Sequence, residues 1–129
     1  MIYLDSSVAL AQLMAEDRYP PAAFWEAPMV SSRLLEFELW TRVHARGLTG
    51  SHGESVRALL GRVAMLELIP EVLARALEPF PLPVRTLDAL HLASLHFLRA
   101  EGLDVPLASY DERMVAAARR LGFPVAPLP

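Results

Sequence analysis

The chain opens with Ile2-Tyr3-Leu4-Asp5, three apolar, β-prone residues that end on an aspartate. A short apolar run of this kind is typical of a buried strand. Asp5 or Ser6 can then cap a helix that runs from Val8 to about Ala15. The sequence therefore begins as a strand followed by a helix, with an acid at the point where the strand ends.

The same alternation of strand and helix continues to the end of the chain. Apolar runs predict strands, and longer stretches that begin at a cap or proline and end at glycine predict helices. Further strands are expected at 29–31, 65–69 and 106–109, with a last edge strand at 125–126. Helices are expected at 33–46, 53–64, 70–78, 87–100 and 112–121. Strands that alternate with helices imply an α/β fold, in which a parallel sheet is covered on both faces.

The composition excludes several kinds of chemistry. The 129 residues include no cysteine and no lysine, so all 12 basic residues are arginine. Disulfides, thiolate metal sites, a P-loop and a lysine general base are therefore impossible. The formal net charge is −3, whereas a protein that binds long nucleic acid through its phosphates is expected to be basic. Any contact with nucleic acid is therefore expected to be local.

The same sequence indicates a cytoplasmic protein. No apolar run approaches the roughly 18 residues that a membrane-spanning helix needs. The N-terminus has neither the basic region nor the cleavage pattern of a signal peptide, and the absence of cysteine fits a reducing compartment. We therefore expect no association with a membrane.

Three aspartates fall where the expected topology would place a site. Ligands of open α/β sheets bind at the carboxyl ends of the strands. Asp5 follows the first strand directly, and Asp111 comes just after the strand at 106–109. Asp88 lies in the first turn of a helix that returns to the sheet. Because aspartate is a common helix starter, a capping role alone is the competing interpretation of each residue.

The fourth acid is either Glu36 or Glu38. At about 100° per residue, Glu38 shares a helix face with small and apolar residues, whereas Glu36 lies nearly opposite. A carboxylate on such a face needs a partner, because burying it unpaired is costly. A metal supplies one, and an ion pair with Arg42 four residues later is the alternative. The pattern favours Glu38 for the site and a solvated position for Glu36.

Four carboxylates in one pocket indicate a divalent metal. Crowded carboxylates repel one another, and some would take up protons unless a cation intervened. Oxygen ligands without histidine or thiolate suit Mg²⁺ or Mn²⁺ better than zinc. Such an ion activates water and stabilises charge on a phosphodiester. We therefore expect metal-assisted phosphodiester hydrolysis, with Asp5, Asp88 and Asp111 as metal ligands and Glu38 completing the catalytic set.

Four stretches of the chain, taken in order, resemble the PIN domain. The most specific of them is Thr86-Leu87-Asp88-Ala89-Leu90-His91-Leu92-Ala93. The others are Ile2-Tyr3-Leu4-Asp5-Ser6-Ser7, Ser32-Arg33-Leu34-Leu35-Glu36-Phe37-Glu38-Leu39, and Ser109-Tyr110-Asp111 ahead of Ala117-Ala118-Arg119-Arg120-Leu121-Gly122. More narrowly, they are similar to the VapC-type toxins of bacterial and archaeal toxin–antitoxin pairs.

The resemblance covers essentially the whole chain and implies a single three-layer α/β/α PIN-like domain over residues 1–129. Its short parallel sheet would have four to five strands. It also implies a Mg²⁺- or Mn²⁺-dependent ribonuclease that acts on RNA, forms a homodimer and is inhibited by a cognate antitoxin protein. The four acids match the acidic positions of the family, and Ser7 matches a small hydroxyl residue that faces the site.

His91 follows Asp88 by three residues and so lies beside it on the helix. It could steady a carboxylate or transfer a proton, and a histidine that is simply satisfied within the core is the alternative. A haloacid-dehalogenase-type phosphatase would need an aspartate where the chain has Ser7, together with a lysine. The remaining alternative to a nuclease is a catalytically degenerate PIN-like module that binds a partner or RNA.

Overall fold

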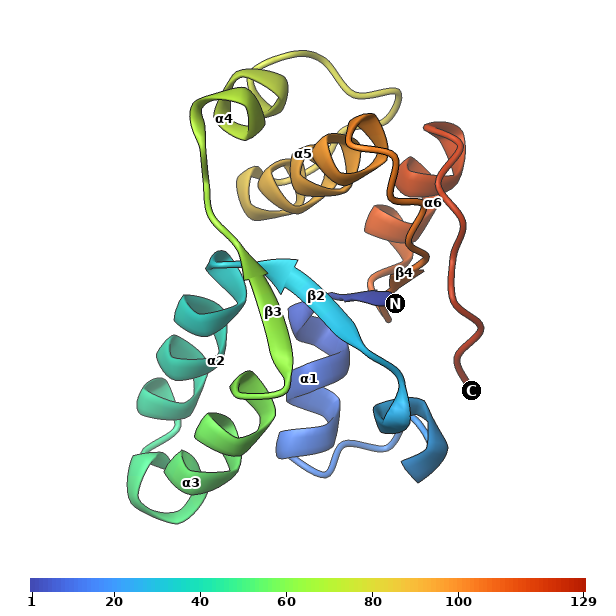
Figure 1. Cartoon of the computed structure of the whole chain (residues 1–129). Coiled ribbons are helices and arrows are strands. Elements are labelled where there is room, and N and C mark those ends of the chain that lie inside the picture. Colours follow the sequence, from blue (N-terminus) through green and yellow to red (C-terminus); the bar gives the residue numbers. More distant parts are fainter.

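The computed structural model describes all 129 residues and contains four strands, six α-helices and one 3-10 helix (Figure 1). None of the helices is both long and apolar enough to cross a bilayer. In chain order the elements are β1 (Ile2–Leu4), α1 (Ser6–Leu13), η1 (Ala22–Glu26), β2 (Met29–Ser32), α2 (Leu34–Ala45), α3 (Thr49–Leu60), β3 (Val63–Leu66), α4 (Pro70–Ala76), α5 (Thr86–Ala100), β4 (Leu107–Ala108) and α6 (Glu112–Arg120).

The strands form one parallel sheet in the order β3-β2-β1-β4. The register pairs Tyr3 with Val30 on one side and with Leu107 on the other. The expected edge strand at 125–126 is reduced to a single parallel bridge between Leu107 and Val125. The α/β fold with a short parallel sheet is therefore confirmed.

Successive strand residues point to opposite faces of the sheet, so the chain has two cores. Leu4 and Met29 pack with α1, α2 and α3, whereas Tyr3 and Val30 pack with α5 and α6. Figure 1 shows the first three helices on one face and α5 and α6 on the other, with α4 packed against α5. Each leucine that is fully buried in these cores stabilises the fold by about 1.5–3 kcal/mol.

The order of the strands creates a crevice between β1 and β4. The chain leaves β1 through α1 on one face of the sheet and leaves β4 through α6 on the other. Where connections diverge in this way, the carboxyl ends of the two strands leave room for a ligand. The topology therefore puts the residues that follow Leu4 and Ala108 at the edge of an open cleft.

Two expected boundaries are wrong by several residues. The helix expected at 53–64 is α3, at Thr49–Leu60, and the strand expected at 65–69 is β3, at Val63–Leu66. Gly53 lies within this helix against Trp40 and Arg57 rather than at its start. Because the helix is shifted toward the N-terminus, Val63 and Ala64 are free to pair with Met29 and Val30. The 3-10 helix η1 was not expected.

Candidate active site

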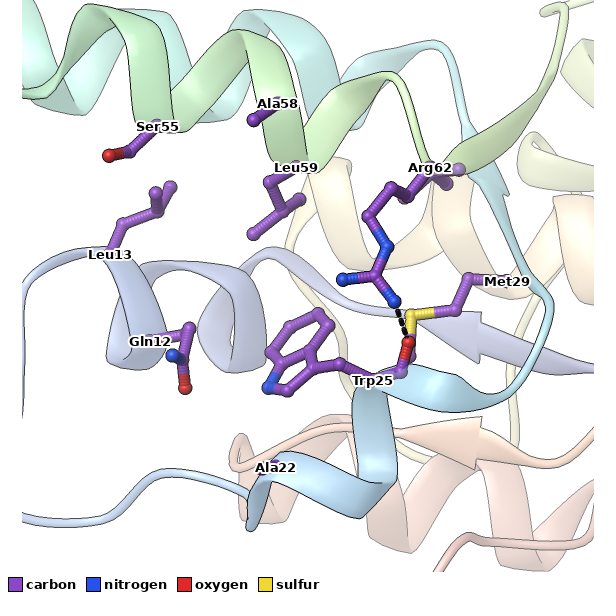
Figure 2. A pocket seen from close by; sticks show the side chains of 10 residues that line it. Gln12, Leu13, Ala22, Trp25, Met29, Ser55, Ala58, Leu59 and Arg62 are labelled. Carbon is purple, nitrogen blue, oxygen red and sulfur yellow. Dashed lines mark hydrogen bonds between the residues drawn. The ribbon is translucent and has the colours of Figure 1, made fainter.

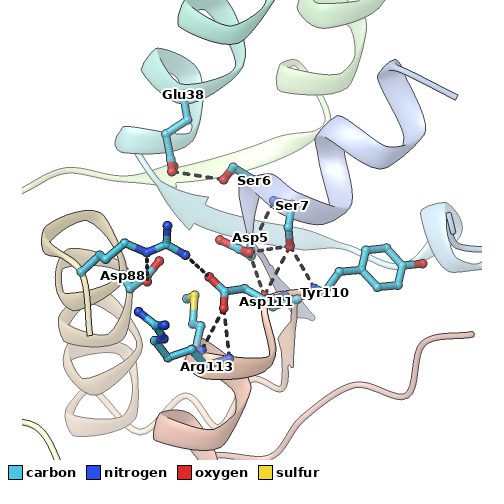
Figure 3. A network of polar contacts seen from close by, with 11 residues as sticks. Asp5, Ser6, Ser7, Glu38, Asp88, Tyr110, Asp111 and Arg113 are labelled. Carbon is cyan, nitrogen blue, oxygen red and sulfur yellow. Dashed lines mark hydrogen bonds and ion pairs between the residues drawn. The ribbon is translucent and has the colours of Figure 1, made fainter. Parts of the chain in front are cut away.

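A cleft of about 410 Å³ lies at the carboxyl ends of β1 and β4, and all four acids expected from the sequence line it. Figure 3 shows the acids converging from separate elements, with Glu38 on the far side from Asp88 and Asp111. Asp5 follows β1, Glu38 lies on α2, Asp88 on α5, and Asp111 precedes α6. Ser6, Ser7, Leu10, Glu16, Arg42, Arg85, Leu87 and Tyr110 complete the lining.

Asp5 is held in place by two serine hydroxyls that join β1 to β4. Ser7 donates to Asp5 Oδ2 at 2.6 Å and Ser109 donates to the same oxygen at 2.8 Å. The two hydroxyls in turn accept the backbone N–H groups of Tyr110 and Asp111. Asp5 is almost fully buried, yet its Oδ1 takes no hydrogen bond. The network fixes one oxygen of the carboxylate and leaves the other to face the cleft.

Asp111 is the N-cap of α6. Its Oδ1 accepts the backbone N–H groups of Arg113 at 3.0 Å and Met114 at 3.3 Å. These bonds satisfy two donors that a helix N-terminus otherwise leaves open. Oδ2 lies 3.6 Å from Arg85 Nη2. The capping interpretation is therefore correct for Asp111, but capping uses only one of its two oxygens.

Asp88 occupies the most unfavourable position of the four acids. Its Oδ2 is buried and has no hydrogen-bond partner, and the nearest cation is Arg85 Nε at 3.8 Å. Burial raises the pKa of Asp88, and the negative charges of Asp111 and Asp5 raise it further. A buried oxygen without a donor, among other carboxylates, is the environment that a bound cation would relieve.

Glu38 differs from the three aspartates because both of its oxygens are engaged. His91 Nε2 lies 2.6 Å from Oε1, and Ser6 donates to Oε2 at 3.1 Å. No ion pair joins Glu38 to Arg42. Burial alone would lower the pKa of His91, but the hydrogen bond to Glu38 and the charges of Glu38, Asp5 and Asp88 outweigh it and raise the pKa.

Glu36 lies outside the cleft. It pairs with Arg33 at 2.9 Å, and Arg33 also binds Glu67 at 2.7 Å on the surface. The prediction that Glu38 lies on the small, apolar face of its helix was only partly correct. The buried residues of α2 are Leu35, Leu39 and Val43. Glu38 flanks these residues and points into the cleft.

The donor set suits a hard divalent metal, although its side chains are not gathered around one point. Asp5 Oδ1 and Asp88 Oδ2 take no hydrogen bond, and the only contact of Asp111 Oδ2 is with Arg85. Oxygen ligands of this kind suit Mg²⁺ or Mn²⁺. In the present arrangement, no three Asp, Glu or His side chains form a group that could hold an ion. Binding of a metal would therefore require these side chains to rearrange.

Arg85 lies beside the Oδ2 atoms of both Asp88 and Asp111. Its guanidinium contacts Asp88 and Asp111 but remains 71% exposed. Arg85 is also the N-cap of α5 and makes no side-chain capping bond. A cation at a helix N-terminus interacts unfavourably with the helix dipole. The position of Arg85 therefore does not stabilise α5.

The sequence did not single out Tyr3, Ser6 or Ser109 as residues of the site. Ser109 stands two residues before Asp111, as Ser7 stands two residues after Asp5, and this symmetry at the two strand ends was a usable signal. Tyr3 had no such signal, because a tyrosine in an apolar strand indicates only the core.

A second cleft, of about 510 Å³, lies away from the acids between α1, η1 and α3 (Figure 2). Leu13, Trp25 and Leu59 line it, and Arg62 donates to the backbone oxygen of Trp25. No carboxylate lines this cleft. It therefore lacks the groups that the expected chemistry requires.

Comparison with protein families matches residues 2–120 to the model of the PIN domain. The chain is 34% identical over 128 residues to the ribonuclease VapC46 of Mycobacterium tuberculosis, covering 96% of this chain and 95% of that protein. It is 30% identical over 133 residues to the ribonuclease VapC47 of the same species, covering 98% and 96%.

Two solved structures share the fold. The toxin VapC20 of M. tuberculosis, which cleaves the sarcin-ricin loop, superposes with a TM-score of 0.69 at 18% identity and 100% coverage of both chains. A toxin–antitoxin complex from Klebsiella pneumoniae gives a TM-score of 0.64 at 11% identity, covering 90% of this chain and 91% of that chain. At these identities the likeness is one of fold.

Proposed function

Because the chain belongs to the PIN-domain family, with VapC proteins among its relatives, we propose that it is a Mg²⁺- or Mn²⁺-dependent endoribonuclease and the toxin of a toxin–antitoxin pair. One observation supports this most directly. Three aspartates and Glu38 meet in one cleft, and each aspartate keeps an oxygen that no hydrogen bond uses.

The three aspartates each keep a free oxygen, whereas both oxygens of Glu38 are hydrogen-bonded, and this difference suggests different roles. Asp5, Asp88 and Asp111 would hold the metal through their free oxygens, with Ser7 and Ser109 fixing the orientation of Asp5. The bound ion would lower the pKa of a water molecule and neutralise charge on the phosphodiester. Glu38, which is held by His91 and Ser6 rather than left free, would orient that water and accept its proton.

Replacement of Asp5 by asparagine tests the proposed reaction. Asp5→Asn keeps an acceptor for the two serines but removes the charge, so cleavage of single-stranded RNA in Mg²⁺ or Mn²⁺ should fall by about a hundredfold or more. The control is Glu36→Gln, which removes a carboxylate from the same end of α2 but outside the cleft. Full cleavage by Asp5→Asn would overturn the proposal.

A catalytically degenerate module that binds RNA or a partner is the second candidate. The observation that favours it is the absence of a ready-made group of three metal ligands. Calorimetric titration with Mn²⁺ separates the two functions. A metal-dependent nuclease should release or take up heat on binding Mn²⁺, and Asp88→Asn should abolish this heat. A pure binding module should show no such heat in either protein.

We also propose that the chain binds a cognate antitoxin, as the solved toxin–antitoxin complex with the same fold suggests, and that it forms a homodimer. Exposed apolar side chains such as Phe37 on α2 and Leu77 beside α4 are surfaces that partners would cover. Sedimentation of the chain alone and with its antitoxin checks both assemblies. A chain that stays monomeric across a wide concentration range would contradict the homodimer.

A further inference from the structure

We infer that Tyr3 and His91 form a buried positioning pair that keeps an N–H donor directed at Glu38, so that Tyr3 is a positioning residue for the reaction. The inference rests on the proposed function, because it assigns these residues to the carboxylate that would accept a proton from water. It extends the site to a strand residue that lies beneath the cleft rather than in its lining.

Three elements contribute to the arrangement. Tyr3 Oη on β1 lies 2.7 Å from His91 Nδ1 on α5, and His91 Nε2 lies 2.6 Å from Glu38 Oε1 on α2. Tyr3 and His91 are both 0% exposed, whereas the Glu38 side chain keeps 15% of its surface exposed. The hydrogen-bonded chain therefore begins in the core and ends at the cleft, and only its last member reaches solvent.

The chemistry of Tyr3, His91 and Glu38 determines which group donates each hydrogen bond. An ionised carboxylate only accepts hydrogen bonds, so the ring nitrogen that faces Glu38 must carry a proton. In neutral His91 the other nitrogen, Nδ1, is then an acceptor for the hydroxyl of Tyr3. In the imidazolium, Nδ1 becomes a donor and the same hydroxyl accepts from it. Because a phenol can do either, Glu38 keeps its N–H donor in both protonation states of His91.

The charges around His91 support this arrangement. Glu38 on α2, Asp5 at the end of β1 and Asp88 on α5 all raise the pKa of His91, against the effect of burial. Tyr3 is fully buried, and its hydroxyl lies within hydrogen-bond distance of His91 Nδ1, where it can donate or accept. Any buried histidine needs partners for its ring nitrogens, and what points to the site here is that one partner, Glu38, lines the cleft.

Tyr3→Phe is the main test, because it removes one oxygen and preserves the shape of the buried ring. We expect kcat for RNA cleavage to fall about threefold to tenfold with KM unchanged, since the loss corresponds to one hydrogen bond. His91→Leu should lower kcat more than Tyr3→Phe does. His91→Gln should recover part of that loss, because an amide N–H can still reach Glu38.

Two further measurements separate positioning from simple loss of stability. The acidic limb of the kcat–pH profile should move to higher pH in Tyr3→Phe and His91→Leu, because a carboxylate with a weakened donor takes up a proton more readily. The ¹⁵N resonances of the His91 ring, recorded without metal, should show a lower pKa in Tyr3→Phe, because the imidazolium has lost the acceptor for Nδ1–H.

The control is Val56→Ala, which removes fully buried volume from the core on the opposite face of the sheet. It should lower the melting temperature and leave kcat and its pH profile unchanged. If Tyr3→Phe behaves in the same way and the His91 resonances do not change, the pair is only structural and the inference is wrong. A wild-type chain that cleaves no RNA would instead contradict the proposed function, and the ring resonances alone would then decide the inference.

Discussion

Asp88 illustrates how the position of a single residue can lower the stability of the fold. Its pKa is raised by burial and by the charges of Asp111 and Asp5, so the folded chain binds a proton at Asp88 more tightly than the unfolded chain does. The stability linked to that proton is complete below the unfolded pKa of about 3.9 and is lost as pH rises through the folded value. At neutral pH, ionised Asp88 therefore destabilises the fold.

Asp88→Asn should consequently stabilise the metal-free chain. The substitution removes the like-charge repulsion, and we expect the melting temperature at neutral pH to rise by about 3 °C. Scanning calorimetry from pH 3.5 to 8 provides the check. The difference between variant and wild type should disappear toward the acidic end, and a variant less stable at neutral pH would contradict the electrostatic account.

Arg85 makes a second prediction at the scale of one residue. Its guanidinium lies near Oδ2 of both Asp88 and Asp111, where it would compete with a metal for the aspartates. Arg85→Ala should therefore increase the affinity for Mn²⁺ by about twofold to fivefold, the size expected for a weak, exposed ion pair. Calorimetric titration measures the effect.

The matched control for Arg85 is Arg33→Ala, since Arg33 pairs with Glu36 and Glu67 away from the cleft. This variant should bind Mn²⁺ as the wild type does. Equal affinity in Arg85→Ala and wild type would show that the guanidinium does not compete with metal.

The placement of the acids could be expected from the sequence because it follows from topology. Asp5 and Asp111 come directly after strands, and strand ends of a parallel sheet gather at one edge. Glu38 could be separated from Glu36 because helical periodicity puts the two on different faces. The engagement of both Glu38 oxygens could not be predicted, because it depends on His91 and Ser6, which lie 53 and 32 positions away in the chain.

At the scale of elements, the N-terminus of α6 combines helix capping with the proposed metal-binding role in one residue. Asp111 Oδ1 caps the helix through two backbone donors, and Oδ2 faces the cleft. Serine caps helices about as well as aspartate does, but alanine does not. The two tasks can therefore be separated by substitution.

Asp111→Ser should unfold at nearly the same denaturant concentration as wild type yet lose RNA cleavage by at least about tenfold to a hundredfold. Asp111→Ala should lose activity to the same extent and about 1 kcal/mol of unfolding free energy as well. Urea denaturation and RNA cleavage assays, run on both variants, provide the comparison. Retained activity in Asp111→Ser would show that capping is the only role of Asp111.

The element boundaries show where local patterns fail. The expected helix began at Gly53, but this residue lies inside α3, where the helix passes close to Trp40. The two-residue strand β4 was expected because Leu107 and Ala108 form a short apolar run shortly before Asp111. The position of α3 depends on its packing against α2, which the local sequence does not reveal.

At the scale of the whole molecule, net charge limits how RNA can be bound. The chain carries 15 acidic and 12 basic side chains, and the cleft itself gathers carboxylates. Arg42 and Arg85 are the two arginines in its lining. A long basic track for the RNA backbone is therefore absent from the cleft, and binding should depend on a few phosphate contacts near the site.

This arrangement predicts a weak dependence of RNA affinity on salt. Each phosphate neutralised on a single strand contributes about −0.7 to the slope of log affinity against log salt. Contacts from Arg42 and Arg85 alone would give a slope of about −1.4, whereas an eight-contact track would give about −5.6. Fluorescence anisotropy of labelled single-stranded RNA with the non-cleaving Asp5→Asn variant, at constant Mg²⁺, measures the slope. A slope steeper than about −4 would require a basic surface outside the cleft, and substrate recognition would then be assigned to that surface rather than to the two cleft arginines.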